Sequence, residues 1–284
     1  MSGRIAAVLG RQPVRVTPVA GGYTQARRVV AELADGSRAF VKVAVDELTA
    51  GWLRAEHRVY SSVRASFLPD LLGWDDDGER PALALEDLSG AHWPPPWPEG
   101  SVDAVLGGLE ALHATPPLSG LPRLVDDARL VGHGWNVVQE DPEPFLSLGL
   151  VSEAWIERAL PALLEAAADA PLDGDSFLHL DVRSDNVCLR GDRALLVDWN
   201  QACLGNPDVD VAAWAPSLRM EGGPDPWRLL PGAGELAAWI SGFFAARAGL
   251  PPPPTADPSV RALQRAQLEV ALPWAARELE LPPQ

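Results

Sequence analysis

The stretch from His179 to Asp198 constrains the fold most, because it places four chemically versatile side chains around one predicted hairpin. His179, Asp181 and Asn186 lie in a loop that leads into a short apolar run. Residues 190–193 have the composition of a tight turn, and a second apolar run ends at Asp198. A hairpin brings the outer ends of its two strands together. Asn186 and Asp198 are therefore predicted to lie side by side.

These residue types fit one kind of chemistry better than they fit turn formation. Asp and Asn are common turn formers, and that role would explain Asp185 and Asn186 but not the whole set. Phosphoryl transfer from a nucleotide uses one carboxylate beside the attacking hydroxyl and oxygen ligands for magnesium. Asp181 matches the first requirement, whereas Asn186 and Asp198 match the second. The loop is therefore typical of a kinase-like phosphotransferase.

Two glycines and a lysine near the N-terminus match the other half of such a site. Gly21 and Gly22 separate strand-like stretches; a plain turn is the common alternative, but glycines also let backbone N–H groups approach phosphates. Lys42 lies within an apolar strand, and burying a lysine is unfavourable unless a partner compensates its charge. Glu56 is the predicted partner, in a segment with helical spacing of apolar residues. In the alternative, both side chains face water.

The chain resembles the aminoglycoside phosphotransferase and choline kinase superfamily, small-molecule kinases that are related in fold to protein kinases. The matching segments are Gly21-Gly22, Lys42, Glu56, residues 83–88, the loop from His179 to Asn186, Asp198-Trp199-Asn200, and the Gly-x-Pro-x-x-Asp pattern from Gly205 to Asp210. The resemblance implies an α+β, bilobal protein-kinase-like fold. An N-terminal lobe with an antiparallel β-sheet and one main helix is expected at 1–87. A mainly α-helical lobe that carries the catalytic β-hairpin is expected at 88–284.

The resemblance also implies a role for each residue of the loop. Asp181 is expected to be the catalytic base, while Asn186 and Asp198 are expected to bind Mg²⁺. Lys42, held by Glu56, is expected to contact the α- and β-phosphates of ATP or GTP.

Binding and bracing roles follow for the remaining positions. The backbone of Glu86 and Leu88 is expected to hold the purine, and the glycines at 21–22 to cover the phosphates. Asp210 is expected to brace the catalytic loop by hydrogen bonds, and His179 to do the same rather than exchange protons.

Three positions depart from the family pattern. Leu180 stands where antibiotic kinases commonly have glycine, and Asn200 stands where relatives often have glutamate. Arg183 replaces a common histidine, and a guanidinium there is suited to hold the transferring phosphate. The alternative is that Arg183 pairs with Asp185 or another loop carboxylate. These departures weaken any transfer of substrate identity.

The predicted activity is ATP- or GTP-dependent and Mg²⁺-dependent transfer of phosphate to a hydroxyl of a small molecule. An aminoglycoside or another cationic amino sugar fits the net charge of −16, although solubility explains the same charge. Choline, ethanolamine, homoserine or a natural-product intermediate are alternative acceptors, so both antibiotic resistance and metabolism stay open. A nucleotide-binding pseudoenzyme is a weaker alternative. The short segment at 198–210 disfavours a kinase that acts on proteins.

Charge and cysteine content narrow the remaining classes. The chain has 39 acidic and 23 basic side chains, which argues against nucleic acid or an anionic membrane as partner. It has no apolar run long enough for a signal peptide or a membrane span. Its two cysteines lack metal-ligand spacing and suggest reduced thiols, so a cytoplasmic location is predicted.

Eleven tryptophans are an unusual number for a chain with two tyrosines. Most are predicted to pack in the core, where indoles bury a large area. Trp93, Trp97 and Trp135 lie in predicted loops, where an indole can stack on a sugar face or a cation. These three are the speculative substrate contacts.

Overall fold

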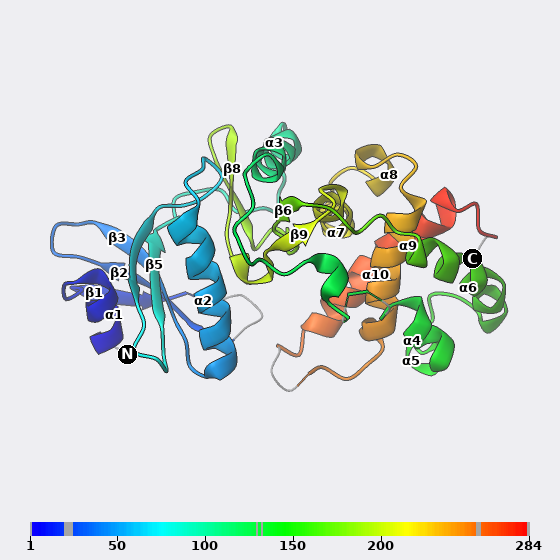
Figure 1. Ribbon diagram of the computed structural model, residues 1–284, viewed down its shortest axis with the longest axis horizontal. Helices are drawn as coiled ribbons and strands as arrows, with labels where there is room; N and C mark the ends of the chain where they lie inside the picture. Colours follow the sequence, from blue (N-terminus) through cyan, green and yellow to red (C-terminus); the bar gives the residue numbers. More distant parts are fainter. Residues whose placement is uncertain (1, 20–24, 129, 132, 254–256, 283–284) are drawn as a thin grey trace. The chain divides into compact units, whose positions relative to one another are not determined.

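The computed structural model describes residues 2–19, 25–128, 130–131, 133–253 and 257–282, and Figure 1 traces the chain. The chain divides into two compact units. The first unit comprises Met1–Pro94, Glu99–Ala111 and Ser184–Gln201, and the second comprises Pro95–Pro98, Leu112–Arg183 and Ala202–Gln284. The proposed division into lobes at 1–87 and 88–284 stays a prediction.

The first unit is built on an antiparallel sheet of five strands in the order β1-β2-β3-β5-β4. The strands are β1 (Arg15–Pro18), β2 (Arg27–Glu32), β3 (Arg38–Val43), β4 (Leu71–Asp75) and β5 (Ala82–Glu86). The same unit contains a hairpin of β7 (Val187–Arg190) and β8 (Arg193–Leu196), whose strands coincide with the predicted apolar runs. It also contains the 3-10 turn η2 (Trp199–Gln201).

Side chains of β3 alternate between two faces of the sheet, one of which packs in the core of this unit. Val41 packs in a buried apolar cluster with Ile5 and Val8 of helix α1 (Ser2–Leu9). Successive side chains of a strand point to opposite faces, so Phe40 and Lys42 point away from that cluster. Both of them line a cavity.

Helix α2 (Glu47–Ser62) includes the predicted helical segment and presents one buried face. Its N-cap is Asp46, whose side chain accepts from the N–H of Thr49 at 2.8 Å, while the Asp46 N–H donates to the Thr49 hydroxyl. This reciprocal pair satisfies backbone donors that the first helical turn leaves open. Leu53, Glu56 and Tyr60 are buried at helical spacing, and this places Glu56 on the inner face.

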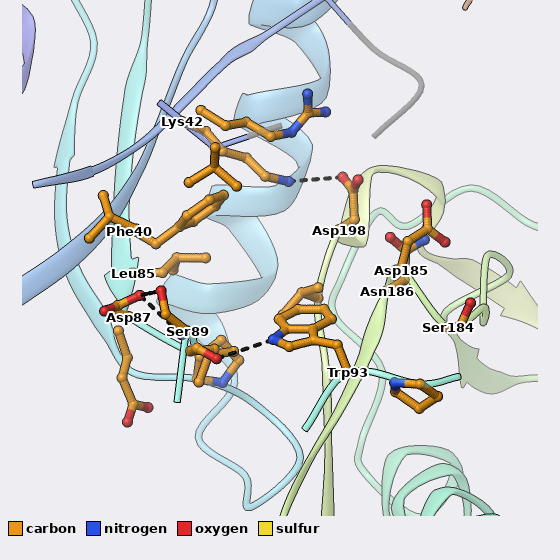
Figure 2. Close-up of a pocket in the computed structure, with 18 residues that line it drawn as sticks. Phe40, Lys42, Leu85, Asp87, Ser89, Trp93, Ser184, Asp185, Asn186 and Asp198 are labelled. Carbon is orange, nitrogen blue, oxygen red and sulfur yellow. Dashed lines mark hydrogen bonds and ion pairs between the residues drawn. The ribbon is translucent and has the colours of Figure 1, made fainter. Parts of the chain in front are cut away.

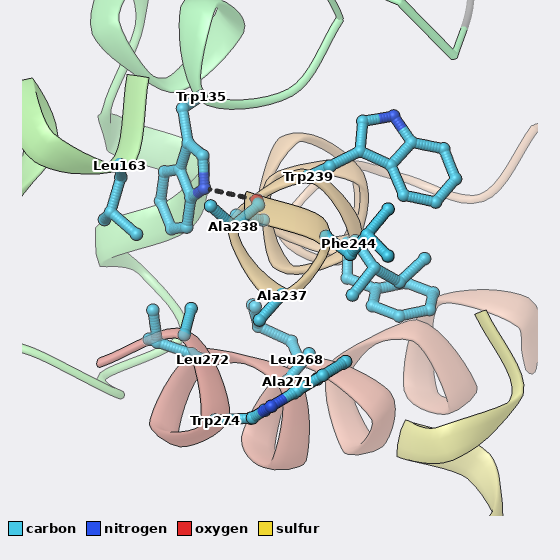
Figure 3. Packing of buried hydrophobic residues seen from close by; sticks show 14 of the residues in the cluster. Trp135, Leu163, Ala237, Ala238, Trp239, Phe244, Leu268, Ala271, Leu272 and Trp274 are labelled. Atoms are coloured by element: carbon cyan, nitrogen blue, oxygen red, sulfur yellow. Dashed lines mark hydrogen bonds between the residues drawn. The ribbon is translucent and has the colours of Figure 1, made fainter. Parts of the chain in front are cut away.

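The second unit is mainly helical. Its elements are the end of α3 (Ser101–His113), the turn η1 (Leu124–Asp126), α4 (Trp135–Glu140), α5 (Glu143–Leu146), α6 (Glu153–Ala168), α7 (Asp208–Met220), α8 (Pro226–Leu229), α9 (Gly234–Ala248), α10 (Val260–Glu278) and the two-stranded sheet of β6 (Ser176–Leu178) and β9 (Cys203–Gly205). Helix α9 is buried on nearly every side and contacts α4, α6 and α10. Figure 3 shows Ala237 and Ala238 of α9 among side chains of the surrounding helices.

The observed elements confirm the predicted α+β class, with an antiparallel sheet towards the N-terminus and helices over most of the remainder. Ser152 caps α6 as an N-cap residue should, because its hydroxyl accepts from the N–H of Trp155. Among the helices of the described residues, none combines the length and apolar character needed to cross a membrane.

Trp135 does not lie in a loop, and that prediction is wrong. It is the first residue of α4, and its side chain is 1% exposed. Its indole N–H donates to the Ala238 carbonyl at 2.9 Å, as Figure 3 shows, and its ring meets Phe145 edge-on. A Cβ at Gly242 of α9 would lie 2.8 Å from the indole, so this glycine makes room for the ring. A ring enclosed in this way has no face for a ligand, and Trp135 is not a substrate contact.

Replacement of Trp135 by alanine should therefore affect stability rather than substrate binding. We expect the free energy of unfolding to fall by about 3–5 kcal/mol, because the change leaves a large cavity and removes the buried hydrogen bond from the indole to the Ala238 carbonyl. Chemical denaturation measures this loss. Trp227→Ala serves as a control, because Trp227 is only partly buried, under the guanidinium of Arg277. An unchanged stability with a raised Michaelis constant for the acceptor would contradict this assignment.

Candidate active site

Three ionisable side chains meet in the first unit, beside the sheet face that carries Lys42. Lys42 Nζ lies 2.9 Å from both carboxylate oxygens of Glu56 and 3.0 Å from Oδ1 of Asp198. Lys42 and Glu56 are almost fully buried, at 6% and 1% exposure. The predicted pairing of Lys42 with Glu56 is therefore present. Asp198 is a second partner of the lysine that the sequence did not predict.

Burial and neighbouring charges shift the pKa values of all three groups. The pKa of Glu56 is raised above its ordinary value, first by burial, and the charge of Lys42 offsets part of the rise. Burial would also raise the pKa of Asp198, but the Lys42 ammonium lowers it to about 2. Burial would lower the pKa of Lys42, but the carboxylates of Asp198 and Glu56 together raise it. Asp198 and Lys42 are therefore charged at neutral pH.

The hairpin brings the two proposed metal ligands together. Val187 pairs with Leu196 at the end of the hairpin, and one residue beyond, the N–H of Val197 donates to the carbonyl of Asn186 at 2.9 Å. Asp198 follows with a φ of 68°, a left-handed conformation that ends the strand. Asn186 and Asp198 both line the same cavity.

This cavity has a volume of about 470 Å³ and is formed within the first unit (Figure 2). Val30, Phe40 and Leu85 form an apolar wall, and Lys42, Asn186 and Asp198 form a polar wall. A third side is formed by residues 86–89, the segment that follows β5 and is called the hinge below. Figure 2 shows the Lys42 ammonium directed at Asp198, with Phe40 and Leu85 on the sheet side. An apolar slot that ends in charged and metal-binding groups suits a planar base joined to phosphates. Gly21 and Gly22 lie outside the described residues.

The hinge after β5 is held by ion pairs of its own side chains. Glu86 pairs with Arg190 at 2.7 Å, and Asp87 pairs with Arg38 at 3.1 Å. The N–H of Glu86 donates to the carbonyl of Asp70. Two ion pairs and a backbone hydrogen bond therefore hold the backbone of residues 86–87 in place.

Trp93 and Trp97 occupy different environments. Trp93 lines the cavity, and its indole N–H donates to the carbonyl of Leu88 at 3.1 Å. Trp97 belongs to the second unit, where its indole N–H donates to Glu221 and its ring packs against Trp214. The structure thus places Trp93 beside the proposed nucleotide site, and Trp97 stays a speculative substrate contact.

A buried carboxylate organises the catalytic loop of the second unit. Asp210 is fully buried and accepts from the N–H of His179 at 3.1 Å and from the N–H of Leu180 at 2.6 Å. The N–H of Asp181 in turn donates to Nδ1 of His179. His179 and Asp210 therefore hold the backbone on which Asp181 is mounted.

Leu180 adopts a backbone conformation for which glycine is better suited. Its φ is 64°, in the left-handed region that favours glycine over residues with a Cβ. The short hydrogen bond from its N–H to Asp210 holds this strained conformation. Leucine is therefore compatible with the same loop shape, at an energetic cost that the carboxylate offsets.

Arg183 pairs with the proposed base itself. Its Nε lies 3.0 Å from Oδ1 of Asp181, and Asp181 is only partly buried. Pairing with a loop carboxylate was one of the two predicted alternatives, and Asp181 is such a partner. A role for Arg183 towards the transferring phosphate stays a prediction.

His113 belongs to this arrangement, although sequence reasoning did not single it out. It is the last residue of α3, and its Nε2 lies 2.8 Å from Oδ2 of Asp210. Among the described residues, the partners of Asp210 are therefore two backbone N–H groups and one imidazole. The signal available in the sequence was weak, because a histidine at the end of an apolar helix is also a favourable neighbour of the helix dipole.

Loss of the Asp210 charge should weaken both the loop and the fold. Asp210→Asn is expected to lower the free energy of unfolding by roughly 3 kcal/mol, because an amide nitrogen replaces one oxygen that accepts buried hydrogen bonds. His113→Ala removes one of the three partners and should have a smaller effect. Thermal and chemical unfolding measure both. Equal stability of Asp210→Asn and the unmodified protein would contradict the bracing role.

The two cysteines are buried in separate units, and burial raises the pKa of each thiol to about 12. Such thiols are poor nucleophiles at neutral pH. Cys188 and Cys203 are therefore packing residues.

Comparison with solved structures shows the same fold in several kinases. A choline/ethanolamine kinase family protein from Mesorhizobium loti is 16% identical, with a TM-score of 0.59 over 94% of this chain and 91% of that one. The macrolide 2′-phosphotransferase from Brachybacterium faecium is 17% identical, with a TM-score of 0.54 over 99% and 97%. An amicoumacin kinase solved with AMP-PNP and Ca²⁺ is 12% identical, with a TM-score of 0.53 over 99% and 85%.

A search among curated proteins finds no match. The sequence does match a family model described as the phosphotransferase enzyme family, over residues 15–267. That span contains Lys42, Glu56, the catalytic loop and Asp210. The chain therefore belongs to the phosphotransferase enzyme family.

Proposed function

We propose that the protein transfers the γ-phosphoryl group of ATP to a hydroxyl of a small molecule, with Mg²⁺. The observation that carries the proposal is Lys42, buried between Glu56 and Asp198 in a cavity that Asn186 also lines. A cation held in this way is suited to bind phosphate oxygens without a large change in its own position. The AMP-PNP bound to the amicoumacin kinase supports an adenine nucleotide as the donor.

The residues of the cavity fit magnesium. Asn186 and Asp198 supply a carbonyl and a carboxylate oxygen, the hard ligands that Mg²⁺ prefers, and Mg²⁺ is commonly held by few protein ligands together with phosphates. Within the described part of the chain, no cluster of three or more His, Cys, Asp or Glu side chains could hold a metal ion without substrate. Bound Mg²⁺ would neutralise charge on the phosphate oxygens.

The side chains divide the reaction between them. Lys42 binds the α- and β-phosphates, and the backbone of Glu86 and Leu88 holds the purine. Asp181 orients the acceptor hydroxyl and accepts its proton while the new bond between oxygen and the γ-phosphorus forms. The bond between that phosphorus and the bridging oxygen of ADP breaks, and ADP leaves. Arg183 stabilises charge on the transferring group.

The proposed acceptor is an alcohol, and the charge of the chain favours a cationic one. An acidic chain attracts cationic compounds, so amino sugars and choline-like alcohols are favoured candidates. An antibiotic hydroxyl and a metabolic hydroxyl are both compatible with this description, because substrate identity depends on the acceptor pocket rather than on the fold. The buried, unpaired thiols support a location in the cytoplasm.

A turnover screen tests the proposal. Purified protein with ATP and Mg²⁺ is mixed with a library of amino sugars, macrolides, amino alcohols and hydroxy amino acids, and ADP release is measured. We expect at least one acceptor to raise ADP release well above that of the Asp181→Asn variant. Binding of ATP without turnover on any compound would favour a pseudoenzyme. Absence of both binding and turnover would reject the proposal.

A further inference from the structure

We propose that Trp93 makes this site selective for adenine over guanine nucleotides, because its indole N–H donates a hydrogen bond to the hinge carbonyl of Leu88. The inference rests on the proposed function, since it concerns the purine end of the same cavity. It adds a specificity-determining residue and a choice of nucleotide that the family resemblance leaves open.

The carbonyl of Leu88 already accepts two hydrogen bonds from the chain. The N–H of Ala91 donates to it at 3.0 Å and closes a tight turn, while the indole N–H of Trp93 donates at 3.1 Å. A carbonyl oxygen has two lone pairs, so both are used. Leu88 and Trp93 line the cavity together, and Figure 2 shows the indole nitrogen directed at this oxygen.

The amide of Leu88 is in the opposite state. Among the residues described, no group of the chain accepts from the Leu88 N–H. The Leu88 N–H is therefore available to a ligand, whereas the Leu88 carbonyl is already hydrogen-bonded within the chain. The ion pairs of Glu86 with Arg190 and of Asp87 with Arg38 keep the hinge in this arrangement.

The two purines need different partners along this edge. Adenine presents an acceptor at N1 next to an amino donor, so N1 takes the Leu88 N–H and the amino group takes the Glu86 carbonyl. Guanine presents an acceptor at O6 followed by donors at N1 and the 2-amino group. With O6 on the Leu88 N–H, those donors face the Leu88 carbonyl, whose lone pairs are taken. Donors left unpaired in a buried site lower affinity.

Removal of the indole N–H is the direct test. Equilibrium dissociation constants for ATP and for GTP, each with Mg²⁺ and without acceptor, are measured by calorimetry for the unmodified protein, Trp93→Phe and Trp93→Leu. We expect the unmodified protein to bind ATP more tightly than GTP. Both variants return one lone pair to Leu88, so the ratio of GTP to ATP affinity should rise about three- to tenfold, as one hydrogen bond allows.

The ratio separates specificity from general damage. Loss of packing would weaken both nucleotides alike and leave the ratio unchanged, which would overturn the inference, as would equal binding of ATP and GTP by the unmodified protein. Two variants of different shape guard against a local packing effect. Trp227→Phe is the matched control and should leave the ratio unchanged, because Trp227 lies in the second unit. Absence of any nucleotide binding to the unmodified protein would instead reject the proposed function.

Discussion

Replacement of Asp181 by asparagine is expected to lower kcat by about 10²- to 10⁴-fold, the usual contribution of a general base. Asparagine keeps the shape of the side chain but cannot accept a proton from the acceptor hydroxyl. The affinity for ATP should change little, because the proposed nucleotide contacts are Lys42 and the backbone of residues 86–88. Steady-state kinetics with a screened acceptor measures the first effect, and calorimetry with ATP measures the second.

The control for this variant is Asp192→Asn, the same isosteric change at the exposed turn between β7 and β8. It should retain full turnover. Asp181→Asn also removes the ion-pair partner of Arg183, but both side chains are partly exposed and such pairs contribute little to stability. An unfolding midpoint close to that of the unmodified protein is therefore expected. Undiminished kcat in a folded Asp181→Asn variant would rule out Asp181 as the base.

Asp198→Asn is expected to lower kcat/KM by about 10³-fold and to raise the Mg²⁺ concentration needed for half-maximal activity. Charge stabilisation by a bound metal contributes several kcal/mol, and each 1.4 kcal/mol corresponds to a factor of ten. An amide is a weaker Mg²⁺ ligand than a carboxylate. The variant also removes one of the two carboxylates beside Lys42, while the contact with Glu56 is kept.

A titration of activity with Mg²⁺ distinguishes this role from a purely structural one. If Asp198 only positioned Lys42, kcat/KM would fall while the Mg²⁺ dependence stayed unchanged, and that result would contradict the metal assignment. The lowered pKa of Asp198 gives a second check on the contact with Lys42. A carboxyl whose pKa is lower in the folded state adds stability above its ordinary pKa, and this is lost as the pH falls towards about 2. Asp198→Asn should lack this part of the acid sensitivity.

Local patterns were sufficient for the elements that carry most of the site. Apolar runs that flank a turn predicted the hairpin, and the register of β7 with β8 then places Asn186 beside Asp198. Strand alternation and helical spacing predicted that Lys42 and Glu56 lie on inward faces, where a buried lysine needs a carboxylate. These inferences held because hairpin pairing and side-chain periodicity are decided by near neighbours in the chain.

Contacts between distant segments could not be predicted in the same way. Trp135 has the local sequence of a loop residue, yet α9, more than 100 residues later, encloses it. His113 and Asp210 are 97 residues apart, so no local pattern predicts that they pair. The backbone of Leu88 was expected to hold the purine, and only the fold of the segment up to Trp93 shows that its carbonyl already accepts an indole N–H.

The sequence by itself determined the chemistry: the residue types and spacings around Asp181, Asn186 and Asp198 are those that phosphoryl transfer requires. The tertiary structure decided which groups remain available for that chemistry. It places a second carboxylate beside Lys42, and it places Asp181 on a loop that Asp210 holds by hydrogen bonds. It also buries Trp135 and directs the Trp93 indole N–H to the Leu88 carbonyl. The reason is physical, since whether a donor or acceptor is free depends on every group that packs against it, and most of those groups are distant in sequence.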